Sequence, residues 1–196
     1  MPYAYYRRLR PWQQRIYRRS DEIVAIPVPA AGELTHVALG IGQALASGDP
    51  QVTTRASHEL LRRICARLGV AAPVVTVLAE RPAGHWGELH GLYNPGDTGG
   101  RITVWMRTAR RGQVVAFRTF LRTLLHELCH HLDYALLRLE YSFHTAGFYK
   151  RESSLYRQLI PQLPATRRRA PSRSPASGPG DPAVAPRIDN PQQHLV

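Results

Sequence analysis

The segment that most constrains the fold of this chain is residues 117–139, where apolar residues recur at helical spacing around the sequence His126-Glu127-Leu128-Cys129-His130, an HExxH pattern. With His126 at 0° and about 100° per residue, His130 falls at about 40° and the apolar residues fall between about 160° and 260°. These residues are Phe117, Leu121, Leu124, Leu125, Leu128, Leu132 and Leu139. We therefore predict a helix, ending near residue 140, with one face in a core and the opposite face carrying two imidazoles.

Two histidines four residues apart on a helix can bind one metal ion, and a glutamate beside the first stands within reach of a metal-bound water. Zinc held by three protein ligands keeps a position for water and lowers the pKa of that water from 15.7 to roughly 7. A neighbouring carboxylate can then accept the proton as the water attacks a peptide carbonyl. We expect His126 and His130 to bind zinc and Glu127 to be the catalytic base. A buried helix with two hydrogen-bonded histidines is the alternative interpretation, but it does not require the glutamate.

A catalytic zinc site needs a third protein ligand. His144 is the candidate, because it follows the predicted helix and precedes a new helix beginning near Gly147. A turn between the two helices would bring the chain back toward the metal. Glu152, one turn into the second helix, is the alternative and would give a site of two histidines and one glutamate.

Two further polar residues of the HExxH helix are placed by the same geometry. Asp133 falls at about −20°, on the ligand face, so we expect its carboxylate to accept the free ring N–H of His126 or His130, with direct metal binding as the alternative. His131 falls at about 140° and is expected to point away from the metal.

Residues 90 to about 156 resemble the catalytic core of the SprT-like (Spartan-type) metalloproteases. The shared features are a glycine-rich stretch, a short strand, a Thr-Leu-Leu sequence before the motif and a histidine followed four residues later by phenylalanine. Here they are Gly91, Tyr93, Gly99-Gly100, residues 101–105, Thr123-Leu124-Leu125, and His144 with Phe148. The resemblance implies zinc, a glutamate base and proteolysis, and it supports His126, His130, His144 and Glu127. Since Cys65 and Cys129 are the only cysteines, the chain cannot hold the cysteine-rich zinc ribbon that often follows such cores.

The remaining pattern predicts an α+β, zincin-like fold. Residues 33–47 and 52–68 are expected to be helical, and residues 74–78, 88–93 and 102–106 to form a small, mainly antiparallel three-stranded sheet. The turn-rich stretch 94–100 predicts a hairpin between the last two strands. Residues 101–107 are the candidate edge strand for pairing with an extended substrate, and a capped edge without a ligand is the alternative.

The net charge of +12 is concentrated at the two ends of the chain. Residues 1–20 hold six arginines and no acid, residues 161–196 hold five arginines and two aspartates, and the middle 140 residues carry a net charge of only +3. Arginines mixed with aromatic residues could bind DNA or other nucleic acid near the N-terminus. Packing of that segment on the core through Tyr5, Leu9, Trp12 and Ile16 is the favoured alternative.

These observations predict a basic aromatic segment at 1–32, a zincin-like metalloprotease domain at 33–160 and a disordered Pro/Arg-rich tail at 161–196. No apolar run is long enough for a membrane span or a signal peptide, so we expect a cytoplasmic protein with both cysteines as buried free thiols.

The substrate would be a protein or peptide. Two functions are left: a zinc metallopeptidase, or a basic nucleic-acid-associated protein with a structural zinc site. Glu127 favours the enzyme, because a structural site of four protein ligands has no use for it. Tyr141, Tyr149 and Tyr156 are candidates, by position alone, for stabilising the oxyanion.

Overall fold

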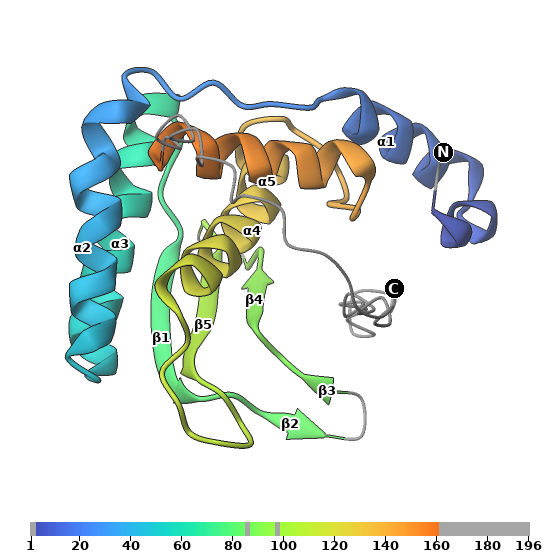
Figure 1. The fold of residues 1–196 in the computed structure, drawn as a ribbon. Helices are drawn as coiled ribbons and strands as arrows, with labels where there is room; N and C mark the ends of the chain where they lie inside the picture. The colour runs from blue at the N-terminus through green and yellow to red at the C-terminus, as the bar shows by residue number, and fades with distance from the viewer. Residues whose placement is uncertain (1–2, 85–86, 97–98, 161–196) are drawn as a thin grey trace, which may run out of the picture. The chain divides into compact units, whose positions relative to one another are not determined.

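The computed structural model describes residues 3–84, 87–96 and 99–160. Within this part the fold is α+β, with five α-helices and a three-stranded mixed sheet (Figure 1). The tail at 161–196, for which disorder is expected, lies outside the described residues.

The central sheet has the strand order β1-β5-β4, where β1 is Val74–Glu80, β5 is Arg101–Arg107 and β4 is Gly91–Asn94. The hairpin prediction is confirmed, since β4 and β5 pair antiparallel. The expectation of a mainly antiparallel sheet is wrong, because β1 pairs parallel to β5. The long connection between β1 and β5 permits this arrangement, whereas a short hairpin connection permits only antiparallel pairing.

The predicted strand at 88–93 is divided in the structure. Its first residue belongs to β3, Gly87–Glu88, which pairs with β2, Ala83–Gly84, in a separate two-stranded sheet. The backbone N–H of Leu89 donates to the carbonyl of Pro82, which closes this small hairpin before β4 begins. Gly87 and Gly91 lie on either side of this break, but the pattern of residues 88–93 alone predicts a single strand.

The placement of residues 101–107 at the sheet edge is also wrong, because β5 is the central strand and both of its neighbours use its backbone groups. The two edges are therefore β1 and β4. On β1 the N–H of Val77 donates to the Thr54 hydroxyl at 2.9 Å, so a helix covers part of that edge.

Five helical segments precede the sheet, and α3 has capping residues at both of its ends. They are η1 (Ala4–Arg8), α1 (Pro11–Glu22), η2 (Ala31–Leu34), α2 (Thr35–Ala46) and α3 (Pro50–Leu68). Asp49 caps α3 by accepting from the N–H groups of Gln51 and Val52, Pro50 occupies the first turn, and Gly69 ends the helix with φ of 69°. The helices predicted at 33–47 and 52–68 are thus found, with residues 33 and 34 in the 3-10 turn.

The HExxH sequence lies within α4, Phe117–Ala135, which ends about five residues earlier than expected. The chain turns at Arg138, a non-glycine residue with φ of 53°, and the N–H of Leu139 donates to the carbonyl of Asp133. The last helix, α5 (Ala146–Leu159), begins next to the predicted Gly147, and the Thr145 hydroxyl accepts from the N–H of Phe148 to cap it.

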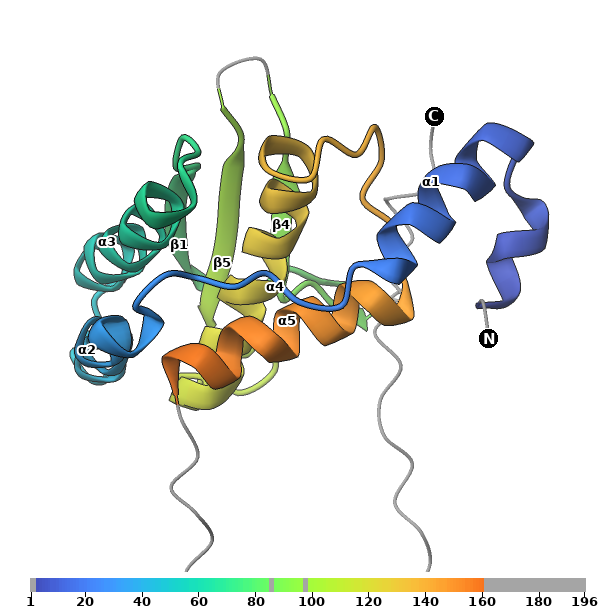
Figure 2. The ribbon, with the colours of Figure 1, turned by 90° about the horizontal axis from the view of Figure 1, so that it is seen from above.

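Helix α4 lies against β4 and β5, α5 packs across α4, and α2 and α3 run side by side next to β1 (Figures 1 and 2). The apolar face of α4 is buried in the main core, as its periodicity predicts, together with Ile102, Val104 and Met106 of β5. Cys65 and Cys129 are buried free thiols, as expected. In the described part of the chain, none of the helices combines the length and apolar character that crossing a membrane requires.

Candidate metal centre

Three histidines from two different parts of the chain converge beside α4. The Nε2 atom of His144 lies 3.0 Å from Nε2 of His126 and 3.1 Å from Nε2 of His130. Three nitrogens bound tetrahedrally to one zinc at about 2.0–2.1 Å would be roughly 3.3 Å apart, so these separations are close to those of a shared ion. His126, His130 and His144 are therefore near enough to one another to hold a metal ion.

The ring of His130 is held by a chain of buried polar groups. Its Nδ1 lies 2.7 Å from the Ser142 hydroxyl, which donates to Oδ2 of Asp133 at 2.7 Å. Because Ser142 uses its proton on Asp133, its oxygen accepts the Nδ1 proton of His130, which leaves the lone pair of Nε2 facing the cluster. The expectation that Asp133 accepts from a histidine directly is wrong: the carboxylate acts through Ser142, because the turn after α4 inserts that hydroxyl between them.

Glu152, the alternative third ligand, is not a member of the cluster. Its Oε2 lies 3.3 Å from Nδ1 of His126, on the side of the ring opposite the cluster, and its Oε1 lies 3.5 Å from the guanidinium of Arg122. Glu152 is thus placed to accept the Nδ1 proton of His126 and to turn Nε2 toward the other histidines.

The surroundings of His130 favour a neutral, metal-binding imidazole. Burial lowers the pKa of His130 well below its usual value, and the charges of His126, His144 and Arg151 lower it further. Lone pairs of neutral imidazoles that converge at about 3 Å repel one another unless a cation lies between them. The cluster therefore has the donor atoms of a metal site, and burial favours the neutral, metal-binding form of His130.

Glu127 is buried beside the cluster, with 5% of its surface exposed. Burial raises the pKa of its carboxyl to about 7, against the opposing effects of His126 and of a hydrogen bond from the backbone of Tyr93. Strand β4 passes so close that a Cβ added at Gly91 would lie 2.4 Å from Oε1 of Glu127 and 2.8 Å from its Cγ. Only glycine allows this approach, so the position of the Glu127 side chain depends on Gly91 of β4.

Arg151 is the main residue of the site that sequence reasoning missed. It is fully buried on α5 and forms an ion pair with Asp133 in which one nitrogen, Nη2, contacts both carboxylate oxygens, at 2.9 Å from Oδ1 and 3.1 Å from Oδ2. Burial raises the pKa of Asp133 to about 6, and the pair with Arg151 and the hydrogen bond from Ser142 oppose the rise. A signal was present in the sequence, since Arg151 lies at helical spacing from Gly147, Phe148 and Leu155, on the side of the helix that carries its apolar residues.

The N-terminal segment contacts the same region. The Tyr5 hydroxyl donates to the backbone carbonyl of His144, and the rings of Trp12 and Tyr141 lie 5.3 Å apart. The predicted packing through Tyr5 and Trp12 is confirmed, whereas the fully buried Tyr17 was not foreseen. The predicted orientation of His131 is also confirmed: it lies near the carbonyl of Ala71 and the hydroxyl of Tyr93 and is absent from the cluster.

Among the tyrosines that are candidates for stabilising an oxyanion, only Tyr149 has its ring beside two cluster histidines. The centroid of that ring is 5.8 Å from His144 and 6.1 Å from His126. Tyr141 instead packs on Trp12 and Phe143, and Tyr156 lies under the guanidinium of Arg122.

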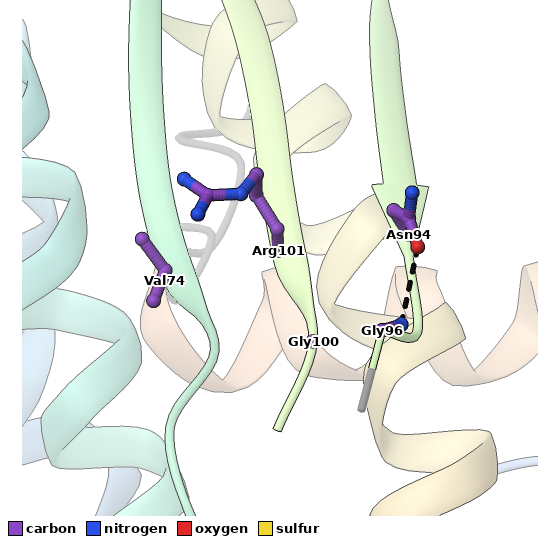
Figure 3. A pocket seen from close by; sticks show the side chains of 5 residues that line it. All are labelled: Val74, Asn94, Gly96, Gly100 and Arg101. Atoms are coloured by element: carbon purple, nitrogen blue, oxygen red, sulfur yellow. Dashed lines mark hydrogen bonds between the residues drawn. The ribbon is translucent and has the colours of Figure 1, made fainter. Parts of the chain in front are cut away.

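A small pocket at the β4–β5 turn is separate from the metal centre. It is lined by Val74, Asn94, Gly96, Gly100 and Arg101, and the Asn94 side chain accepts from the N–H of Gly96 on one side of it (Figure 3). None of these residues belongs to the histidine cluster.

Comparisons of the chain with models of protein families, with curated proteins and with solved structures found no match.

Proposed function

We propose that the chain is a zinc metallopeptidase in which His126, His130 and His144 bind the ion and Glu127 is the general base. The observation that carries the proposal is the convergence of the three Nε2 atoms beside a buried glutamate. That glutamate, Glu127, lies on α4 together with His126 and His130. Three protein ligands with a free carboxylate alongside are the arrangement of hydrolytic zinc sites.

In the proposed mechanism, each protein group has a separate role. Zinc, when bound, lowers the pKa of water and polarises a carbonyl oxygen. Glu127 accepts a proton from the attacking water and returns it to the departing amine nitrogen. Ser142 with Asp133, and Glu152, hold the rings of His130 and His126 with Nε2 toward the ion. Tyr149 is the candidate for stabilising the oxyanion, since its ring stacks on His144.

We further place the substrate on the outer edge of β4 instead of β5. β4 is an edge strand whose Gly91 lies against Glu127, and an extended peptide pairing with it would pass the base. The other edge strand, β1, already donates an N–H to α3 at Val77.

The proposal is tested by incubating the zinc-loaded protein with an unfolded protein, with and without single-stranded DNA. Glu127→Gln should retain zinc and fold but lower the cleavage rate by about 10²–10⁴-fold, the usual loss for a general base. Glu140→Gln, at an exposed position after α4, is the matched control and should cleave like the wild type. Undiminished cleavage by Glu127→Gln would eliminate the proposed mechanism.

The third ligand is tested by metal analysis of His144→Ala, which should lose zinc, since two histidines alone bind it weakly. Glu152→Gln keeps an oxygen near His126 and should retain zinc. Full zinc occupancy in His144→Ala would show the assignment of His144 to be wrong, and Glu152 would be examined next as the ligand.

The second candidate, a nucleic-acid-associated protein with a structural zinc site, has less support. Structural zinc sites are closed by four protein ligands, whereas the described residues bring three ligand side chains together here. The buried Glu127 has no role in such a site.

A further inference from the structure

The third histidine of the cluster lies on a segment that has no regular structure of its own. Residues 136–145 connect α4 to α5 without a helix or strand, and His144 is the residue before the cap of α5. Irregular backbone is positioned only by what packs against it, so the geometry of His144 depends on contacts from elsewhere in the chain.

Several of those contacts come from the N-terminal segment, residues 3–23. On the N-terminal side of His144, Trp12 packs on Tyr141, and the ring centroid of Tyr17 is 6.1 Å from that of Phe143. At His144 itself, the Tyr5 hydroxyl donates to the backbone carbonyl at 3.0 Å.

On the C-terminal side of His144, α1 is fixed to the start of α5. The carboxylate of Asp21 accepts from the N–H of Gly147 at 2.8 Å. Gly147 is required there, because an added Cβ would lie 2.3 Å from the carbonyl oxygen of Asp21 and 2.6 Å from that of Ser20. Both views show the end of α1 meeting the beginning of α5 (Figures 1 and 2).

Arg151 connects the contact between α1 and α5 to Asp133, on the His130 side of the metal centre. Arg151 donates to the backbone carbonyls of Ser20 and Ile23 and to the Ser20 hydroxyl, while its Nη2 also pairs with Asp133. Since Asp133 orients His130 through Ser142, the N-terminal segment is connected to His144 directly and to His130 through Arg151.

We propose that residues 3–23 are a clamp that positions the metal ligands, with Tyr5 the positioning residue for His144. The proposal rests on the metal centre of the proposed function and goes beyond it, because it couples docking of the N-terminal segment to metal binding. Coupling of this kind is reciprocal: if docking raises zinc affinity, bound zinc holds the segment in place by the same factor.

The first test compares Tyr5→Phe with Tyr6→Phe in the full chain. Both remove one hydroxyl from the same 3-10 helix, but the hydroxyl that donates to His144 is that of Tyr5, whereas Tyr6 packs its ring on Tyr17. Tyr5→Phe should lower zinc affinity, measured by competition with a chelator, by about tenfold or more, and should shift the visible absorption of the Co²⁺-loaded protein. Tyr6→Phe should match the wild type in both.

The second test needs no substitution. Trypsin can cleave the segment after the exposed Arg7, Arg8, Arg15 and Arg18. Cleavage at these arginines, followed by mass spectrometry, should be faster in zinc-free than in zinc-loaded protein. Cleavage in 161–196 yields fragments of different mass and does not interfere.

Unchanged zinc affinity in Tyr5→Phe, an equal loss in Tyr6→Phe, or cleavage at the N-terminal arginines that does not depend on zinc would each overturn the clamp. Neither test measures peptide hydrolysis by this protein. A chain that binds zinc but does not cleave peptides would therefore remove the peptidase proposal and leave the clamp standing, whereas a chain that binds no zinc would remove both.

Discussion

At the scale of single residues, the buried pair of Asp133 and Arg151 determines how His130 is held. Both side chains have no exposed surface. Removing the carboxylate would leave a buried cation without its partner, a change that typically costs about 3–5 kcal/mol of stability. Asp133→Ala would therefore disturb folding as well as metal binding. Ser142 is the better residue for testing the orientation of His130, because its loss leaves the ion pair intact.

Ser142→Ala should weaken zinc binding by about 10–100-fold, the usual effect of losing a partner of a ligand, with only a small change in unfolding free energy. The reason is that His130 loses the acceptor that fixes its Nδ1 proton. Affinity is measured by chelator competition, and Ser153→Ala, at a half-buried position on α5, is the control. Wild-type affinity in Ser142→Ala would mean that Ser142 does not orient the ligand.

Gly91→Ala tests the fit between β4 and the catalytic base. The new Cβ would overlap the Glu127 side chain, which must move, and a displacement of about 1 Å can cost 10²-fold in rate. We expect zinc content to persist and proteolysis to fall by about that factor. Gly40→Ala, on α2, meets nothing within 4 Å and should keep full activity. Equal activities in the two variants would show that the carboxylate tolerates the shift.

At the scale of elements, the sequence predicted what local patterns control. The helical spacing of leucines predicted α4 and its buried face, and the turn residues at 94–100 predicted the hairpin. Strand order is set by packing between distant segments, so the central position of β5 and the parallel pairing of β1 were missed. The end of α4 was misplaced because the left-handed turn residue is Arg138, where a glycine would have been the signal.

In the candidate site, too, the sequence predicted the residues that local patterns control and missed those that depend on packing between distant segments. The two histidines of the motif follow from helix geometry, and His144 follows from the turn after the helix. The partners of Asp133 could not be predicted, because Ser142 and Arg151 reach it only after α5 has packed on α4. The apolar residues around Arg151 gave no indication of which acid it would pair with.

Gly147→Ala tests the contact between α1 and α5. The Cβ would meet backbone oxygens of Ser20 and Asp21, which cannot rotate away as a side chain can, so the helices must separate. We expect a loss of about 1–3 kcal/mol in unfolding free energy, the range for overpacking, measured in urea. Gly32→Ala meets nothing within 4 Å and provides the control. Equal stability of the two variants would show that the contact is more pliable than its geometry indicates.

At the scale of the whole molecule, the structure shows which residues of the N-terminal segment pack on the core and which are exposed and could bind nucleic acid. The aromatic residues Tyr5, Trp12 and Tyr17 pack against the segment that carries His144. The arginines between and after them are exposed, and the guanidinium of Arg19 donates to the backbone carbonyl of Leu137. Most of the positive charge of this segment is therefore available to a partner without being needed for the fold.

Replacing Arg7, Arg8, Arg15 and Arg18 together by glutamine should leave the melting temperature and zinc content unchanged, because these side chains are exposed. If the segment binds DNA, the slope of log affinity against log salt should fall by about 0.7–0.9 for every phosphate that the variant no longer neutralises. Titration of labelled single-stranded DNA at several salt concentrations measures this slope.

Deletion of residues 1–23 is the contrasting variant. It should lower the melting temperature, because it also removes Tyr17 and the acceptors of Arg151. A glutamine variant with the affinity and slope of the wild type would place any DNA binding outside these four arginines.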